Sequence, residues 1–176
     1  MKHHGRSKFT YPIDTSFVEP DVPIARRLTL EVSSDFYKGI DNKCVGIYIF
    51  KSDTEIVDIG QSTQGLRRRI GGYCRSFRVF EIEKKQYHII NESTTCELLI
   101  FENSENLHID QFEYRIKSFE WKLIRHYSPK FNKSGTLKKE VWSNNHWELL
   151  ELKNRLIAEN NTDGKKVRSE LNELLQ

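Results

Sequence analysis

Glu120 is the residue whose type and position point most directly to chemistry. Residues 107–127 are predicted to form a helix whose apolar side chains recur every three or four positions and so share one face. The apolar members of that face are Ile109, Phe112, Ile116, Phe119, Leu123 and Tyr127. Glu120 falls near the centre of this stripe, and a glutamate is rarely buried unless it is paired or binds a metal. The position predicts a metal-binding carboxylate, a salt bridge to a buried arginine, or a stripe that reaches the surface there.

A run of basic residues, Arg67 to Arg69, lies between Leu66 and Ile70. If these residues form a helix with Leu66 and Ile70 on its apolar face, Arg67 and Arg68 point away from that face and Arg69 lies beside it. Arg69 is therefore predicted to reach a phosphate at the edge of the sheet. The other two are predicted to meet solvent or a nucleic-acid backbone, although such a run is more often only a solvated face.

Two strand-like segments, residues 45–51 and 56–62, flank a turn signal at residues 52–54 and predict an antiparallel hairpin. Tyr48 shares a strand face with Phe50. It is either a core tyrosine with a bonded hydroxyl or a group that acts on a water molecule, and a tyrosinate base would need a lowered pKa.

Further elements must position these residues. A helix is predicted from Leu66, a strand over residues 96–101 and a half-buried strand over residues 27–33, while residues 78–95 are predicted as a strand plus an exposed loop. Amphipathic helices are expected over residues 145–160 and from residue 163 onward. The pattern is that of an α+β protein.

The 176 residues are 37% hydrophobic and 30% charged, which suits one domain of ordinary size with appendages. The net charge of +3 supports nucleic-acid binding only where the charge is clustered. The cysteines Cys44, Cys74 and Cys96 are widely spaced and indicate reduced thiols in an intracellular, cytoplasmic protein. There is no apolar run for a membrane span and no apolar region of a signal peptide.

The order and spacing of several motifs resemble the GIY-YIG nuclease family. They are Gly46-Ile47-Tyr48, Asp58-Ile59-Gly60, Arg69, Tyr73, Glu120 and Asn132. The resemblance covers about half the chain. It implies a small three-stranded antiparallel sheet flanked by helices over residues 44–135. An N-terminal arm (1–43) precedes this domain and a C-terminal helical extension (136–176) follows it.

The resemblance also implies a function, which is metal-dependent cleavage of DNA phosphodiesters. In that comparison Glu120 holds Mg²⁺ or Mn²⁺, Arg69 neutralises charge on the phosphoryl oxygens, and Tyr48 orients or deprotonates water. Asn132 fixes the local geometry, and the backbone at Gly60 gives the phosphate room. The residues expected to contact nucleic acid are Arg67, Arg68, Gly60, Tyr73 and Lys130.

The second motif departs from the family, because Asp58 stands where a tyrosine is expected. Asp58 is an accessory metal ligand or base, a neutral replacement beside a sufficient Tyr48, or a sign that only binding is retained. The loop after Gly60 also carries one extra residue, so that a strict count selects Arg68 as the catalytic arginine. Arg69 is preferred because its place on the helix and its motif context agree.

The predicted function is therefore a DNA endonuclease of restriction, repair or mobile-element type. A catalytically weakened nucleic-acid-binding module on the same fold is the alternative, and a small α/β interaction domain with solvated basic residues is a third possibility. Duplex DNA is the expected partner, no membrane is involved, and the protein is expected to be a monomer or a homodimer.

Overall fold

The computed structural model describes residues 11–135. The chain divides into two compact units, Met1–Lys133 and Ser134–Gln176. The predicted C-terminal helical extension (136–176), with both of its expected helices, lies outside the described residues, as does the beginning of the N-terminal arm.

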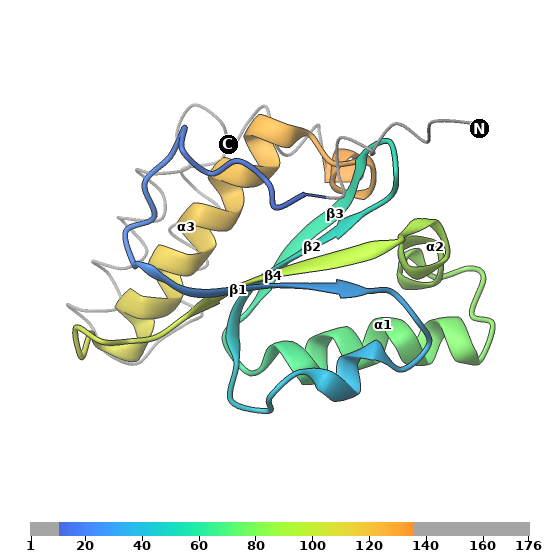
Figure 1. Cartoon of the computed structure of the whole chain (residues 1–176), viewed down its shortest axis with the longest axis horizontal. Helices are drawn as coiled ribbons and strands as arrows, with labels where there is room; N and C mark the ends of the chain where they lie inside the picture. The colour runs from blue at the N-terminus through green and yellow to red at the C-terminus, as the bar shows by residue number, and fades with distance from the viewer. Residues whose placement is uncertain (1–10, 136–176) are drawn as a thin grey trace, which may run out of the picture. The chain divides into compact units, whose positions relative to one another are not determined.

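The described residues form an α+β fold (Figure 1). Its elements in chain order are β1 (Ile24–Glu31), η1 (Phe36–Gly39), β2 (Val45–Lys51), β3 (Ile56–Ser62), α1 (Leu66–Arg78), α2 (Lys85–Glu92), β4 (Thr95–Phe101), α3 (Ile109–Tyr127) and η2 (Lys130–Gly135). The predicted hairpin, the helix that begins at Leu66, and the strand near residue 96 are confirmed.

The described sheet has four antiparallel strands in the order β1-β4-β2-β3. The expected three-stranded sheet was wrong, because residues 24–31 of the N-terminal segment pair along β4. This strand has one half-buried face, as its alternating sequence predicts. The hairpin of β2 and β3 leaves β3 at the opposite edge, where one side of the strand has no neighbouring strand.

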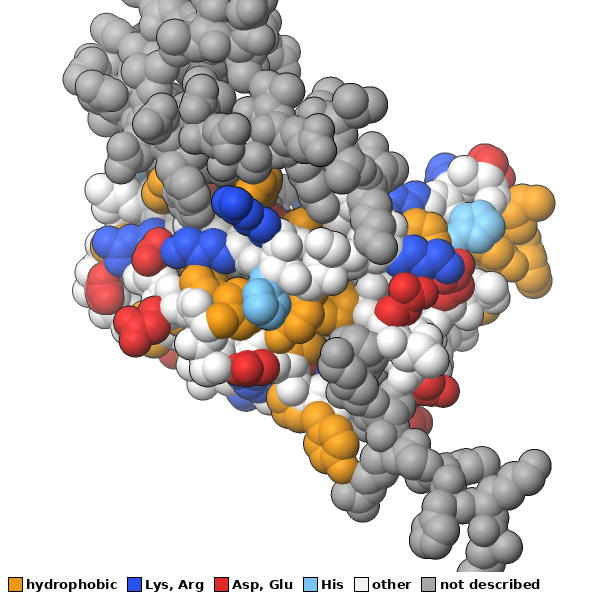
Figure 2. Space-filling model, turned by 90° about the horizontal axis from the view of Figure 1, so that it is seen from above, with side chains coloured by type: hydrophobic (Ala, Val, Ile, Leu, Met, Phe, Trp, Pro, Cys, Tyr) orange, Lys and Arg blue, Asp and Glu red, His pale blue; other side chains and the backbone are white. Residues whose placement is uncertain are grey.

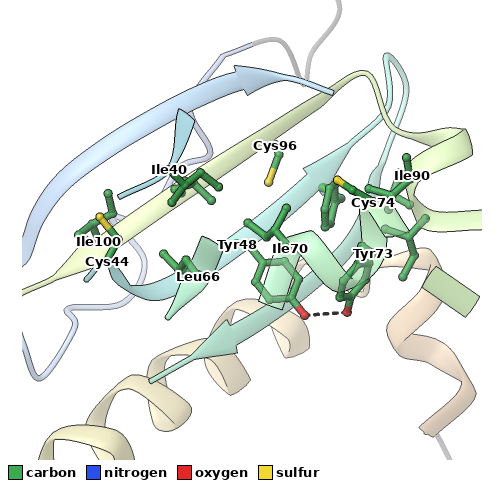
Figure 3. Close-up of a cluster of buried hydrophobic side chains, with 14 residues drawn as sticks. Ile40, Cys44, Tyr48, Leu66, Ile70, Tyr73, Cys74, Ile90, Cys96 and Ile100 are labelled. Carbon is green, nitrogen blue, oxygen red and sulfur yellow. Dashed lines mark hydrogen bonds between the residues drawn. The ribbon is translucent and has the colours of Figure 1, made fainter. Parts of the chain in front are cut away.

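Helices cover both faces of the sheet, with α3 on one face and α1 and α2 on the other (Figure 1). Strand β2 is buried on both sides, so its residues alternate between the two cores. Ile47 and Ile49 pack beneath α3. Tyr48 packs beneath α1 together with Ile70 (Figure 3), and Phe50 belongs to the same core.

A buried ion pair joins β2 and β4 beneath the N-terminal segment. Lys51 Nζ lies 3.0 Å from Glu97 Oε2, and both side chains are fully buried. The Glu97 carboxylate also accepts from the Ile13 backbone N–H at 2.9 Å, and Lys51 donates to the Tyr11 carbonyl at 2.9 Å. These bonds satisfy charges that would otherwise be costly to bury, and they attach residues 11–13 to the sheet.

The predicted strand within residues 78–95 was wrong, because residues 85–92 form the helix α2. Its buried residues, Ile89 and Ile90, belong to the core beneath α1, and Tyr87 stacks on Phe77 with ring centroids 5.5 Å apart. Two adjacent apolar residues in a charged segment give no clear period, so the sequence pattern alone did not identify this short helix. No helix within residues 11–135 is long and apolar enough to cross a membrane.

Candidate active site

A polar cleft of about 550 Å³ lies beside the edge strand β3, where α1 and α3 approach from opposite faces of the sheet. It is lined by Gln61, Ser62, Thr63, Gln64, Gly65, Arg68, Arg69, Gly72, Glu113 and Lys117. The end of β3 and the loop that follows it form one wall, and the first turns of α1 form another. The cleft therefore gathers residues from three elements that are separate in the sequence.

Arg69 is held in place by two buried tyrosines. Its Nε donates to Tyr48 Oη at 3.3 Å, and its guanidinium lies 5.6 Å from the centre of the Tyr73 ring. The hydroxyls of Tyr48 and Tyr73 are 2.7 Å apart (Figure 3). Arg68 lines the same cleft, whereas Arg67 is not among the lining residues. Both candidates for the catalytic arginine thus face the cleft, and Arg69 alone bonds to Tyr48.

The hydroxyl of Tyr48 does not have the properties expected of a base. The residue is only 1% exposed, and burial raises its pKa well above the ordinary value, with Tyr73 and Asp58 adding to the rise. The charge of Arg69 lowers this pKa, but by less than burial raises it. Tyr73 is also buried, its pKa is raised to about 12, and its ring lies against the Arg69 guanidinium.

Gly60 accommodates the Tyr48 ring. The two residues are directly opposite each other in the hairpin. A Cβ at position 60 would lie 2.1 Å from Tyr48 Oη, far inside van der Waals contact. The room expected here for a phosphate is thus taken by the phenol, and the glycine is required because Tyr48 lies across the edge strand.

Gly60→Ala is expected to lower the free energy of unfolding by about 1–3 kcal/mol, the usual cost of overpacking a core. The measurement is urea unfolding at equilibrium. Gly72→Ala is the matched control, because no atom lies within 4 Å of its added Cβ. Alanine in that helical position is expected to stabilise by up to about 1 kcal/mol. Equal stability of the two variants would contradict the proposed contact between Tyr48 and Gly60.

Asp58 is buried and paired with a residue that the sequence analysis did not select. Its Oδ1 lies 3.2 Å from Lys85 Nζ, and its side chain is 3% exposed. Burial raises the pKa of Asp58, while the charge of Lys85 opposes that rise. Neither Asp58 nor Glu120 is among the residues that line the cleft, and the Asp58 charge acts on the Glu120 carboxyl. Lys85 lies at the start of the short helix α2, and no sequence signal connected it with Asp58.

Glu120 lies on α3 one turn beyond Lys117 and is half-buried. Burial raises the pKa of its carboxyl to about 8, and the Asp58 carboxylate contributes, while Lys117 and Arg69 act in the opposite direction. Within residues 11–135 no hydrogen bond or ion pair reaches this carboxylate. The salt bridge to a buried arginine, one of the expected alternatives, is therefore absent from the described part of the chain.

The chemistry of Glu120 fits a Mg²⁺ ion bound mainly through water and substrate. Among residues 11–135 there is no group of three or more His, Cys, Asp or Glu side chains arranged to hold a metal. Mg²⁺ commonly uses only one or two protein carboxylates and keeps several waters or phosphate oxygens. One carboxylate without a partner in the described chain, beside a polar cleft, is compatible with that mode of binding.

Asn132 fastens η2 to the open edge of the sheet. Its Oδ1 accepts from the Ile59 N–H and its Nδ2 donates to the Ile59 carbonyl, both at 2.9 Å. Asn132 thereby satisfies backbone groups on the side of β3 that has no strand neighbour. Lys130, expected to contact nucleic acid, forms an ion pair with Glu92 and lies 5.6 Å from the Phe131 ring centre.

Glu113 and Lys117 are cleft residues that the sequence analysis missed. They precede Glu120 by seven and three positions, so the three residues share one face of α3. That spacing was a usable signal.

The functional interpretation of the cleft rests on its geometry and on the sequence motifs. Comparisons with protein-family models, with curated proteins and with solved structures found no match.

Proposed function

We propose that this chain is a divalent-metal-dependent endonuclease that hydrolyses DNA phosphodiester bonds on a GIY-YIG-like fold. The observation that carries the proposal is the convergence of Arg69 and Glu120 beside the edge strand. Each comes from a helix on a different face of the sheet, and the positive charge of Arg69 lowers the pKa of the Glu120 carboxyl. A guanidinium and a free carboxylate beside one polar cleft suit a phosphate with its counterion.

Arg69 has the geometry to stabilise charge that develops on a phosphoryl group. Its Nε donates to Tyr48 and its guanidinium also interacts with Tyr73, and the side chain lines the cleft in which phosphate oxygens would bind. Tyr48 and Tyr73 restrain the guanidinium, and such preorganisation is the main source of electrostatic catalysis. We assign Arg68 to binding a neighbouring phosphate, because it lines the same cleft and is exposed.

Glu120 would hold the divalent cation, Mg²⁺ or Mn²⁺, which supplies Lewis-acid stabilisation of the phosphate and the leaving oxygen when bound. The carboxylate is suited to this role because nothing in the described chain competes for it. Tyr48 is a positioning residue in this proposal, since its hydroxyl is buried and bonded to Arg69. Asn132 keeps the edge strand and η2 together.

A nucleic-acid-binding module without cleavage is the second candidate function. The observation that favours it is the buried pair of Asp58 and Lys85 at the place of the motif tyrosine. If that tyrosine is indispensable, the cleft would retain phosphate binding through Arg68 and Arg69 but lose turnover. Oligomeric state and cellular location remain predictions in both cases.

Supercoiled plasmid is expected to be nicked by the full chain in Mg²⁺ or Mn²⁺ and to remain intact in EDTA. An Arg69→Ala protein purified in parallel excludes a contaminating nuclease. A gel shift at increasing salt, performed in EDTA, separates a binding module from an interaction domain with solvated charges. Cleavage that persists in the chelator would contradict the single-metal proposal, and binding without nicking would favour the module.

A further inference from the structure

The solvent-facing side of α1 carries Arg68 and Arg75 and no acidic residue. The helix contains five arginines and no acidic residue. Arg68, Gly72, Arg75 and Val79 succeed one another at steps of four, three and four residues, so they form one stripe. All four are exposed, and the first two line the cleft. The stripe therefore leads from the cleft to the C-terminal end of the helix.

Three apolar side chains stand exposed where the stripe ends. Val79, Phe80 and Ile82 are 57%, 73% and 61% exposed. Hydrophobic side chains gather at the right edge of Figure 2, beside a histidine and near side chains of both charges, on the side where the α1–α2 connection lies in Figure 1. Exposed apolar residues are ordinary when scattered singly, but a cluster on one turn marks a contact surface.

The backbone presents Phe80 to solvent in an unusual conformation. Its φ is 54°, in the left-handed region. The N–H of Glu81 bonds to the Ser76 carbonyl at 3.0 Å and that of Phe80 to the Phe77 carbonyl at 3.2 Å, which is the helix-ending arrangement that normally has glycine at this place. A phenylalanine in this backbone conformation is strained relative to glycine, and its ring is exposed to solvent. This combination is typical of functional surface residues.

We propose that the stripe and the apolar tip at its end, formed by Val79, Phe80 and Ile82, bind a nucleic-acid strand. Phosphates would lie on Arg68 and Arg75, and a base would lie against Phe80. This inference rests on the proposed function, because it extends the strand that occupies the cleft. Charge complementarity selects the partner, since the stripe carries Arg68 and Arg75 on a helix without acidic residues, which matches a polyanion. The Phe80 ring in the tip adds an aromatic face on which a base can stack, an interaction that phosphate binding alone does not provide.

The length of the stripe sets the register of this contact. From Arg68 to Val79 the helix advances about 16 Å at 1.5 Å per residue. Stacked nucleotides are spaced about 3.4 Å apart, so Phe80 meets a base roughly five nucleotides from the phosphate in the cleft. A strand gripped at both points is held in one direction relative to Arg69.

The test measures the affinity of the full chain for a 2-aminopurine-labelled 30-mer duplex in EDTA, by anisotropy across a salt series. Phe80→Ser is expected to weaken binding about tenfold, in the range for stacking on one base, and to leave the salt slope unchanged. It should also remove the rise in 2-aminopurine fluorescence that marks an unstacked base. Arg75→Ala is expected to reduce the salt slope by about one unit.

A matched pair of substitutions controls for the loss of surface hydrophobicity. Ile82→Ser lies in the tip and Ile109→Ser lies at the start of α3, and the parent side chains are 61% and 54% exposed. Only the first is expected to weaken binding. Equal affinity of Phe80→Ser and wild type would overturn the inference, as would sedimentation showing that the tip holds two copies of the chain together.

The proposed function is tested separately from this inference, because its measurement is plasmid nicking in Mg²⁺ and not DNA affinity in EDTA. Nicking by wild type with unchanged affinity in Phe80→Ser overturns only the inference. Binding that depends on Phe80, without any nicking, supports the inference and overturns the proposed function. A wild-type chain that binds no duplex at all overturns both.

Discussion

Glu120→Gln is expected to abolish metal-dependent nicking and, at pH 8.5, to raise the melting temperature. The two effects have one cause, which is a carboxylate kept half-buried without a partner in the described chain. Glutamine keeps the shape of the side chain but binds Mg²⁺ poorly, so cleavage falls to background while DNA binding in EDTA remains. Glutamine also removes a charge that is costly to desolvate.

The direction of the stability change follows from the pKa of Glu120. The folded-state pKa is about 8 and lies above the ordinary value of 4.5, so the folded protein holds a proton that the unfolded chain has lost between these values. The stability of the wild type therefore falls as pH rises through that window, and Glu120→Gln does not share that fall. A gain of ~1 kcal/mol corresponds to about 2–4 °C in a chain of this size.

Thermal unfolding at pH 5 and pH 8.5, with and without Mg²⁺, checks this prediction. The variant should gain stability only at the higher pH, and Mg²⁺ should stabilise wild type but not the variant. Asp110→Asn is the control, since it makes the same carboxylate-to-amide change in the first turn of α3, outside the cleft lining, and should keep cleavage. A Glu120→Gln protein that is less stable at pH 8.5, or that still nicks in Mg²⁺, would contradict the assignment.

Elements with a strong period or clear turn chemistry were predictable from the sequence. The turn at residues 52–54 and the alternation on either side of it specify the hairpin, and the structure has strands over 45–51 and 56–62. The apolar stripe likewise specifies α3 to within two residues at its start. Strand β1 was predicted as a strand, but its pairing with β4 was not predicted, because strand pairing depends on contacts between residues far apart in the sequence.

The parts of the site that could not be predicted are those set by contacts between elements. Nothing local in the sequence indicates that Tyr48 lies across Gly60 or that its hydroxyl meets Tyr73. The pairing of Asp58 with Lys85 joins residues that are 27 positions apart, one of them on a helix that was not predicted. Tyr48, Asp58 and Gly60 were selected by their positions in a motif, whereas their burial and contacts depend on the folded chain.

Tyr48→Phe is expected to lower turnover about a hundredfold in the wild-type background and to have almost no effect in an Arg69→Ala background. The hydroxyl is 1% exposed and accepts a bond from Arg69 Nε at 3.3 Å, so its removal acts through the guanidinium. Losing Arg69 itself should cost about 10²–10³ in turnover, as for other groups that stabilise developing charge. Residues that act as one unit give strongly non-additive effects.

Single-turnover cleavage by the two single variants and the double variant, at saturating metal and DNA, completes this cycle. If Tyr48 were the base that deprotonates water, its loss would multiply the loss from Arg69→Ala, and the pH profile of Tyr48→Phe would change. A positioning role instead predicts an unchanged profile.

Asp58→Asn is the matched control among the buried polar groups, because it preserves shape and lies outside the cleft lining. We expect that variant to cleave, since Lys85 is 44% exposed in its side chain and is solvated without its partner. An inactive Asp58→Asn beside an active Tyr48→Phe would move the essential group from the tyrosine to the aspartate.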